Sequence, residues 1–289
     1  MLKLDYISAR GDILPLTDNP YFHITNFDGQ TVAGASISSA VIGGIDGDTV
    51  NNVQATARTI IIDLQIKSGV NVETAKREIL KVVKIKQRGE IVWTQNGRTV
   101  NIWGVVEAVE MARWTNSALM QITLHCEQPF WEDVDNIIQQ IGEAFGMHYF
   151  TESPVDMLYF PEEGIPLGEY DTTRSKSMYN DGDVSVGLEI TILAHDTVTN
   201  PIIYDNNGNF FGLGYEGNPF VLPMGEYVVI TTHKGQKKAI YNGVNIFDKI
   251  RPRSTWLQLA AGDNTFTINS DDDNKNNVSF SFIYRQRYV

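Results

Sequence analysis

Short runs in which apolar and polar residues alternate recur along this chain, and turns rich in glycine and asparagine separate them. This two-residue period is typical of a strand that buries one face. The segment 59–66 shows it most clearly, because every second residue from Ile60 to Ile66 is isoleucine or leucine. The pattern predicts a mainly β protein, and 289 residues at ~150 per domain favour two domains.

A helix is predicted over residues 72–88. Asn71 can cap its start, Gly89 can close it, and apolar residues recur within it at helical spacing. Lysine and arginine cover its remaining faces, which predicts a solvated surface, with docking of an acidic neighbour as the alternative. A weaker apolar pattern predicts another helix over 133–145.

A hairpin is expected after this helix, because an Asn-Gly pair at 96–97 separates the runs 91–93 and 100–103. The next predicted strand, 119–126, carries Cys126 on its apolar face. We therefore expect Cys126 to lie in the core rather than to act as a nucleophile. Because it is the single cysteine, the sequence excludes an intrachain disulfide framework and a cysteine-cluster metal site.

The domain boundary is predicted just after Trp131, because Pro129 cannot donate to a β ladder and should end the sheet. This gives an N-terminal domain over 1–131, a connector over 132–180 and a C-terminal domain over 181–289. The C-terminal domain holds several short predicted strands with turn signals between them, which indicates a sandwich or jelly roll.

Charge excludes some classes of function. Lysine and arginine number 23 and aspartate and glutamate 35, so the formal net charge is −12, with a pI near 4.8. That balance argues against a nucleic-acid-binding domain and against docking on an anionic membrane. No apolar run approaches the ~20 residues of a membrane span, and the start lacks the features of a signal peptide. We therefore expect a soluble chain that folds in a reducing cytosol, without membrane insertion.

Residues 212–217 match the dinucleotide fingerprint G-x-G-x-x-G. The fingerprint needs a helix directly after the glycines, because the helix N-terminus holds the pyrophosphate. Pro219 and Pro223 deny such a helix, so we expect no dinucleotide cofactor.

A nearby segment partly matches a calcium-loop template. Positions 1, 3, 5 and 12 of the template are occupied by Asp205, Asn207, Asn209 and Glu216. Phe210 stands in place of the glycine that makes the sharp turn of such a loop, and no flanking helix is evident. A turn between two strands explains the segment better, so we expect no bound metal.

No catalytic motif emerges from the sequence. No two of the five histidines are closer than 23 positions, and no H-E-x-x-H, G-x-S-x-G or Walker sequence occurs. The acid clusters at 162–163 and 271–273 hold adjacent residues, which rarely form the facing pair of a glycoside hydrolase. The sequence predicts no catalytic residue and no enzyme, with a hydrolase built from distant carboxylates as an open alternative.

Two ordered strings of short motifs point to a family. The N-terminal string runs from Gly43-Gly44 through Ala57-Arg58-Thr59-Ile60 and the predicted helix to Ile122–Trp131. The C-terminal string holds Asn180–Asp183, Asn200–Ile203, Ile230–Lys237, Asn245–Ile250, Ser254–Leu259 and Gly262–Phe266. Together they resemble the distal tail protein family of long-tailed phages, in particular those that infect Gram-positive bacteria. The resemblance covers nearly the whole chain and is weakest over 132–180.

The resemblance implies an N-terminal β-sandwich with one packed helix and a C-terminal β-sandwich or jelly roll that is galectin-like. It also implies a structural virion protein, a homo-hexameric ring at the distal end of the tail tube that assembles in the host cytoplasm. The N-terminal domains would surround a channel through which DNA passes without specific binding. The implied neighbours are the tail tube protein and the tail-associated hub protein, with receptor-binding or baseplate proteins held by the C-terminal domains.

The segment 43–57 is long, polar and without a strand or helix pattern, and loops of that length in compact domains are usually functional or disordered. We expect it to order against a neighbouring subunit or ring. The residues predicted for this contact are Gly43, Gly44, Asp46, Asp48, Asn51 and Asn52. A second hypothesis is that Asp46 and Asp48 line the channel, where their negative charge would keep DNA from sticking.

The alternative function is a carbohydrate-binding module that contacts the host cell surface, because jelly rolls often hold sugars in an aromatic-lined groove. The platform would consist of Tyr204, Phe210, Phe211, Tyr215 and Trp256. Aromatic side chains in a sandwich more often fill its core, which favours the structural explanation of these residues.

Overall fold

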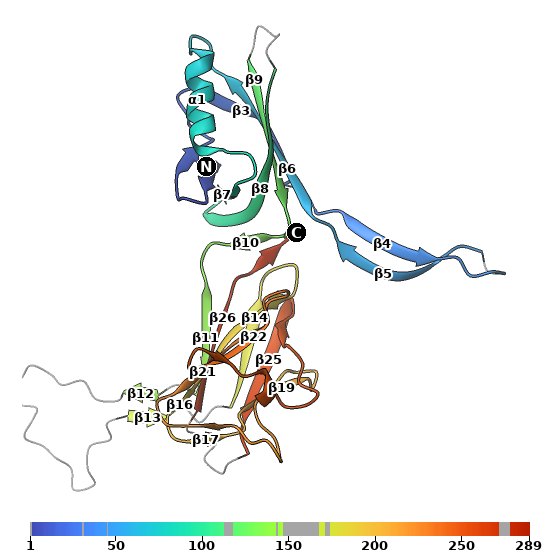
Figure 1. Ribbon diagram of the computed structural model, residues 1–289, viewed down its shortest axis with the longest axis vertical. Helices are drawn as coiled ribbons and strands as arrows, with labels where there is room; N and C mark the ends of the chain where they lie inside the picture. The colour runs from blue at the N-terminus through green and yellow to red at the C-terminus, as the bar shows by residue number, and fades with distance from the viewer. Residues whose placement is uncertain are drawn as a thin grey trace, which may run out of the picture. The chain divides into compact units, whose positions relative to one another are not determined.

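The computed structural model describes residues 2–30, 32–44, 46–112, 118–142, 144–146, 168–170, 174–271 and 278–289. Over these residues the protein is mainly β, as the alternating runs predict. The chain divides into an N-terminal unit of residues 1–134 and 287–289 and a C-terminal unit of residues 135–286 (Figure 1). The last three residues return to the N-terminal unit, so the chain passes between the units twice.

An antiparallel sheet forms the N-terminal unit. Its strands are β1 (Lys3–Ser8), β2 (Ile13–Pro15), β3 (Phe22–Asp28), β6 (Arg58–Ile66), β7 (Arg88–Gln95), β8 (Arg98–Ala112) and β9 (Leu119–Cys126). They lie in the order β2-β1-β7-β8-β9-β6-β3. The predicted strands 59–66 and 119–126 are confirmed as β6 and β9, and the predicted hairpin is β7–β8 with its turn at 96–97.

Helix α1 (Val72–Val82) packs its buried residues Ala75 and Ile79 into the core of the N-terminal unit. The Asn71 side chain caps it, as predicted, and accepts hydrogen bonds from the backbone N–H groups of Glu73 and Thr74. Within the described ranges, no helix combines the length and the apolar character that crossing a bilayer requires.

The predicted end of this helix near Arg88 is wrong. Val83 is already extended, with φ −89° and ψ 110°, and Arg88 begins strand β7. Gly89 pairs with Ser8 of β1 and Gly104 of β8, so it is a strand residue and not a helix cap. Strand pairing on both sides of β7 overrides the helical spacing of the local sequence.

The second predicted helix, over 133–145, is also wrong. This stretch forms the strands β10 (Trp131–Asp133), β11 (Ile137–Ile141) and β12 (Ala144–Gly146). β10 pairs with β8 and with β27 (Arg287–Tyr288), and β11 pairs with β26 (Val278–Tyr284). These partners lie far away in the sequence, so a local apolar pattern gives no sign of them.

The C-terminal unit is a sandwich of antiparallel sheets. One sheet consists of β11, β26, β16 (Glu189–Ala194), β21 (Tyr227–Thr231), β22 (Lys238–Tyr241) and β23 (Val244–Asn245). The other consists of β14 (Ser175–Asn180), β25 (Gly262–Asn269), β18 (Ile202–Tyr204) and β19 (Phe210–Gly212). Short additional elements are β12 paired with β13 (Gly168–Tyr170), β15 (Val186–Gly187) with β24 (Gln258–Leu259), β17 (Val198–Thr199) with β20 (Val221–Leu222), and the 3-10 helix η2 (Phe247–Lys249).

Residues from both of these sheets share one core. The rings of Phe266 in β25 and Phe282 in β26 are fully buried, with their centroids 5.4 Å apart. Two sheets that close over a common apolar layer make a β-sandwich, which confirms the class expected for the C-terminal half.

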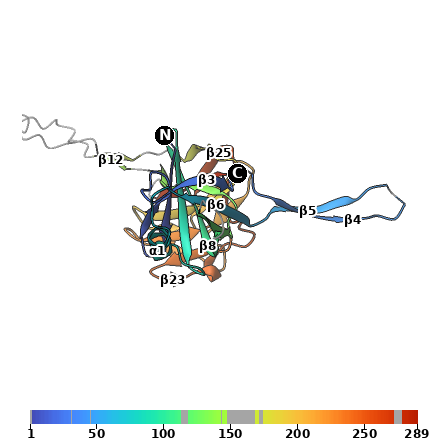
Figure 2. The same ribbon diagram turned by 90° about the horizontal axis from the view of Figure 1, so that it is seen from above.

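A two-stranded ribbon, here called the arm, leaves the N-terminal unit between β3 and β6. It consists of β4 (Ala35–Ala40), β5 (Thr49–Ala55) and the tip between them. Figures 1 and 2 show it extending away from the sheet of its own unit. The prediction that 43–57 lacks strand structure is therefore wrong, because β5 lies within it. The alternation in β5 is masked in the sequence by an irregularity described below.

Gly89 provides a test of the core of the N-terminal unit. A Cβ atom at this position would lie 2.2 Å from the hydroxyl oxygen of Tyr6, whose side chain is buried. We expect Gly89→Ala to lower the free energy of unfolding of this unit by about 2 kcal/mol through overpacking, measured by urea unfolding. Tyr6→Leu in the same background should restore part of the loss. Gly43→Ala is the control, since nothing lies within 4 Å of a Cβ there.

Candidate functional site: assembly surfaces and the C-terminal polar network

The arm has two chemically different faces. Cross-strand partners place Ile37 opposite Val53, and Ser38 opposite Asn52, on alternate sides of the ribbon. One side carries Ala35, Ile37, Ser39, Val50, Val53 and Ala55, and the other Ser36, Ser38, Ala40, Thr49, Asn52 and Gln54. The first is the apolar face and the second the polar face. Every residue of both strands is exposed to solvent.

A β-bulge maintains this separation. The register shifts between Ser38 and Ser39, so Asn51 has no residue opposite it and Val50 pairs with Ser39. Without the extra residue, strict alternation would put Val50 on the polar face, away from Val53. The bulge therefore makes the apolar face continuous. It also interrupts the alternation of apolar and polar residues in β5, so the sequence pattern does not predict this strand.

The base of the arm is fastened at two points. The Arg58 guanidinium Nη1 donates to the carbonyl oxygen of Gly29 at 2.8 Å, and the Thr56 N–H donates to the carbonyl of Gly34 at 2.8 Å. Arg58 is 5% exposed, and its Nε and Nη2 have no hydrogen-bond partner among the described residues. Burial lowers the pKa of this guanidinium from its usual range. A charged side chain is thus buried to fix where the arm leaves the sheet.

The predicted contact residues all lie on the arm. Gly43, Gly44, Asp46 and Asp48 form its tip, Asn51 is the bulged residue, and Asn52 lies on the polar face. The structure therefore brings the six residues onto one projecting ribbon. Their contact with another subunit remains a prediction.

The N-terminal sheet has an open face on the side away from its buried core. A polar row crosses this face, with Glu110, Gln121, Asp63 and Asn26 on the neighbouring strands β8, β9, β6 and β3. Gln121 Nε2 donates to Asp63 Oδ1 at 2.8 Å, and Asn26 Nδ2 donates to Asp63 Oδ2 at 3.2 Å. These bonds hold the Asp63 carboxylate in place on the open face.

The neighbouring rows of the open face add one further carboxylate and, at their β7 end, one arginine. Their side chains, by register, are His23 and Gln65, then Asp28, Ile61, Thr123 and Ala108, then Thr59, His125 and Val105. On β3, β6, β8 and β9 the charged groups of these rows and of the polar row are Asp28, Asp63 and Glu110. The last row continues from Val105 to Arg88 of β7, which forms an ion pair with Glu127. Sequence reasoning missed this surface, because only the register places residues from β3, β6, β8 and β9 side by side.

Cys126 lies in the core, as predicted. Its side chain is fully buried, and burial raises the pKa of the thiol to about 11. A thiol with that pKa is protonated near neutral pH, and the thiolate is the reactive form. His125 points to the open face on the other side of β9, so the two side chains do not form a nucleophile–base pair.

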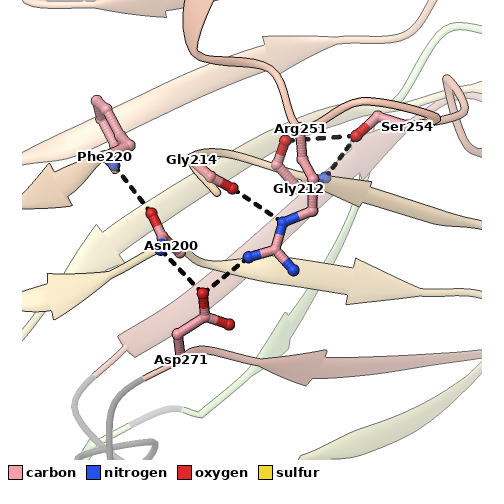
Figure 3. Close-up of polar contacts among 7 residues, drawn as sticks. All are labelled: Asn200, Gly212, Gly214, Phe220, Arg251, Ser254 and Asp271. Carbon is pink, nitrogen blue, oxygen red and sulfur yellow. Dashed lines mark hydrogen bonds and ion pairs between the residues drawn. The ribbon is translucent and has the colours of Figure 1, made fainter. Parts of the chain in front are cut away.

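The glycine pattern at 212–217 belongs to a polar network of the C-terminal unit (Figure 3). The Asn200 side chain accepts from the Phe220 N–H at 2.9 Å and donates to Asp271 Oδ2 at 2.8 Å. Arg251 donates from Nε to the Gly214 carbonyl and from Nη2 to Asp271, both at 2.9 Å. The network ties three chain segments together around the glycine-rich turn.

Close approach explains why Gly214 is glycine. Its φ is +70°, and a Cβ there would lie 1.9 Å from Asn200 Oδ1. The segment runs from Gly214 through an isolated bridge between Tyr215 and Asn218 into β20, and no helix follows it. The match to a dinucleotide fingerprint therefore arises from turn geometry and from packing against Asn200.

Three of the calcium-loop residues, Asp205, Asn207 and Asn209, form a turn between β18 and β19, whereas Glu216 lies beyond β19. The Asp205 carboxylate accepts from the N–H groups of Asn207 and Asn209 at 2.9 and 2.8 Å, and also from the Asn209 side chain. This is an Asx turn, as the sequence indicates. In the part of the chain that the structure describes, no three His, Cys, Asp or Glu residues are grouped to hold a metal. The acid cluster 162–163 lies outside that part.

The five aromatic residues of the alternative sugar platform lie in separate groups. Tyr204 and Phe210 face one another with ring centroids 6.0 Å apart, while Phe211 is buried against Trp256 at 5.1 Å. The ammonium of Lys237 lies over the Trp256 ring, 5.7 Å from its centroid. Tyr215 is partly exposed on the glycine-rich turn. Whether any of them binds sugar remains a prediction.

Comparison with known proteins finds a family model that matches part of the chain. Residues 181–288 match the family model described as siphovirus-type tail component, C-terminal domain. A search of the curated proteins found no match. The match shows that residues 181–288 are similar to the C-terminal domain of siphovirus-type tail components, and it confirms the resemblance to distal tail proteins.

Solved structures extend the likeness to the whole chain. The crystal structure of the SPP1 Dit protein (gp 19.1), described as a paradigm of the hub adsorption apparatus in phages that infect Gram-positive bacteria, is 14% identical, with 100% of each chain covered and a TM-score of 0.66. The phage P2 baseplate in its activated conformation with calcium is 13% identical over 98% of each chain, with a TM-score of 0.46. The first of these shows that both units share the fold of that tail protein.

Arg58 allows the arm to be loosened without unfolding the sheet. We expect Arg58→Met to speed thermolysin cleavage within 32–57 several-fold, because the clamp on Gly29 is lost. Global unfolding should change by less than about 1 kcal/mol, since the lost hydrogen bond is offset by removal of a buried, partly unpaired charge. Equal cleavage of variant and parent would contradict the clamp. Arg10→Met, at an exposed arginine, is the control.

Asn200 tests the polar network. It is buried with φ +53°, and its side chain satisfies the Phe220 N–H. We expect Asn200→Ala to cost about 2–3 kcal/mol in the C-terminal unit, seen as faster hydrogen exchange in β18 and β25. Asn242 has a similar φ of +50° but is exposed on a turn, so Asn242→Ala should cost only about 1 kcal/mol. Equal effects would show that backbone conformation alone matters at Asn200.

Proposed function

We propose that this protein forms a homo-hexameric ring at the distal end of a phage tail tube. In this proposal the N-terminal units make the ring around a central channel for DNA, and the C-terminal units carry baseplate or receptor-binding proteins. The tail tube protein and the hub protein are its axial neighbours in the virion, and assembly takes place in the host cytoplasm. The protein has a structural role and performs no catalysis.

The observation that carries the proposal is the exposed apolar face of the arm. An isolated two-stranded ribbon is marginally stable in water. The side chains of Ile37, Val50 and Val53 are exposed on this ribbon, so they contribute hydrophobic stabilisation only when another surface covers them. A neighbouring copy is the partner that a ring supplies at every arm. The exposed apolar face therefore supports the prediction that the arm is buried against a neighbouring subunit when the ring assembles.

The open face of the N-terminal sheet suits the wall of the channel. On β3, β6 and β8 it carries Asp28, Asp63 and Glu110, and the carboxylate of Asp63 is held in place by its neighbours. Arg88, at the β7 end of these rows, is paired with Glu127. Six copies would line the channel with negative charge, which repels the DNA phosphates and favours passage without binding. We therefore assign the wall of the channel to this face rather than to Asp46 and Asp48.

The ring is tested by the mass of the purified 32.4 kDa chain in solution and by negative-stain images. We expect six-fold rings, and thermolysin should cut the arm more slowly in the ring than in dissociated subunits. Ile37→Ser with Val53→Ser should abolish ring formation, because it removes the apolar face. The matched control, Thr49→Ser with Gln54→Ser on the polar face, should leave rings intact. A stable monomer at all concentrations would contradict the proposal.

A further inference from the structure

Helix α1 and the segment that leads from it to β7 together carry many basic residues and two exposed aliphatic ones, and are here called the basic surface of α1. Residues 72–88 hold six lysine or arginine residues against two glutamates, within a chain of net charge −12. Leu80 in α1 is 38% exposed, and Ile85 in the segment after it is 58% exposed. Among the described residues, no ion pair involves Lys81 or Lys84, which lie next to them. This basic surface is thus solvated in a single copy, although large aliphatic side chains lie within it.

The tip of the arm has the complementary composition. Val41 and Ile42 are 81% and 49% exposed, and they lie close in sequence to Asp46 and Asp48. Between residues 32 and 57 these two aspartates are the only charged residues. Nothing lies within 4 Å of a Cβ built at Gly43, Gly44 or Gly47, so the tip makes no close packing within its own chain at these positions.

We propose that the arm tip of one copy docks on the basic surface of α1 in the next copy around the ring. Val41 and Ile42 pack on Leu80 and Ile85, while Asp46 and Asp48 pair with lysines such as Lys81 and Lys84. The inference rests on the proposed ring and names the contact that closes it. The two patches differ, so the contact is heterologous, and such a contact generates a closed ring when the rotation closes.

Both surfaces would be stabilised by this contact, through burial of aliphatic side chains and through pairing of opposite charges. Each patch exposes two large aliphatic side chains that gain free energy only when they leave water. The charges around them have opposite sign, which orients the two surfaces and disfavours contact between like patches of two copies. A second copy is the one partner sure to be present at the concentration of the chain itself.

Charge reversal tests the pairing. Lys81→Glu with Lys84→Glu should shift the concentration at which half the chains are in rings upward by about tenfold or more, measured by sedimentation in the full chain. Asp46→Lys with Asp48→Lys should do the same. Combining all four changes should restore assembly, and high salt should weaken the parent but not abolish its rings. Rings that ignore both reversals would overturn the docking while leaving the proposed ring intact.

A cysteine pair gives an independent readout, because the native Cys126 is buried. With Ile42→Cys and Ile85→Cys in one chain, oxidation should produce a ladder of covalent oligomers up to six copies. A mixture of the two single variants should stop at dimers. Ile42→Cys mixed with Ile13→Cys, at another exposed isoleucine of the same unit, is the control and should not cross-link.

The outcomes separate the two proposals. If Glu110→Lys, and not Asp46→Lys, rescues the reversed helix, then the open sheet face is the partner of α1 and the inference is overturned. If the parent chain forms no ring at any concentration, the proposed function itself fails, whatever the charge variants do.

Discussion

An apolar surface that one copy of the chain cannot bury governs the arrangement of the N-terminal unit. The arm places Ile37, Val50 and Val53 on one exposed side of a two-stranded ribbon, which has no core of its own. The structure supports this ribbon at its base instead, with the buried Arg58 clamped to Gly29. A fold that buries a charge to fix the base of an exposed ribbon is suited to contact with another molecule, which supports the proposed ring.

The surfaces of the N-terminal unit differ in charge. The total of −12 includes a basic stretch over α1 and the segment after it, an open sheet face with carboxylates on β3, β6 and β8, and an arm whose two aspartates are at its tip. A uniformly acidic surface would keep copies apart, whereas opposite patches on one unit let copies join in a fixed direction. The same distribution keeps negative charge on the face proposed for the DNA channel.

Several sequence motifs acquire a simpler explanation in the fold. The glycines at 212–217 allow the turn to approach Asn200, and Arg251 and Asp271 hold that turn in place. The calcium-like segment at 205–216 begins with an Asx turn, and Phe211 fills the core. In each case the spacing of residue types is produced by local backbone requirements of a sandwich, which is why a motif without its structural context carries little weight.

The sequence by itself determined what depends on neighbours along the chain. The alternation of β6 and β9, the Asn71 cap, the turn at 96–97 and the burial of Cys126 could all be predicted, because each is a local pattern or a property of one strand face. Only the tertiary structure decided that residues 133–145 form strands and that the chain end returns to pair with β10, because the partners are distant in sequence. The same holds for the candidate surfaces. A single bulged residue, Asn51, sets the apolar face of the arm, and the register of four strands builds the acidic open face, so neither has a periodic signature in the sequence.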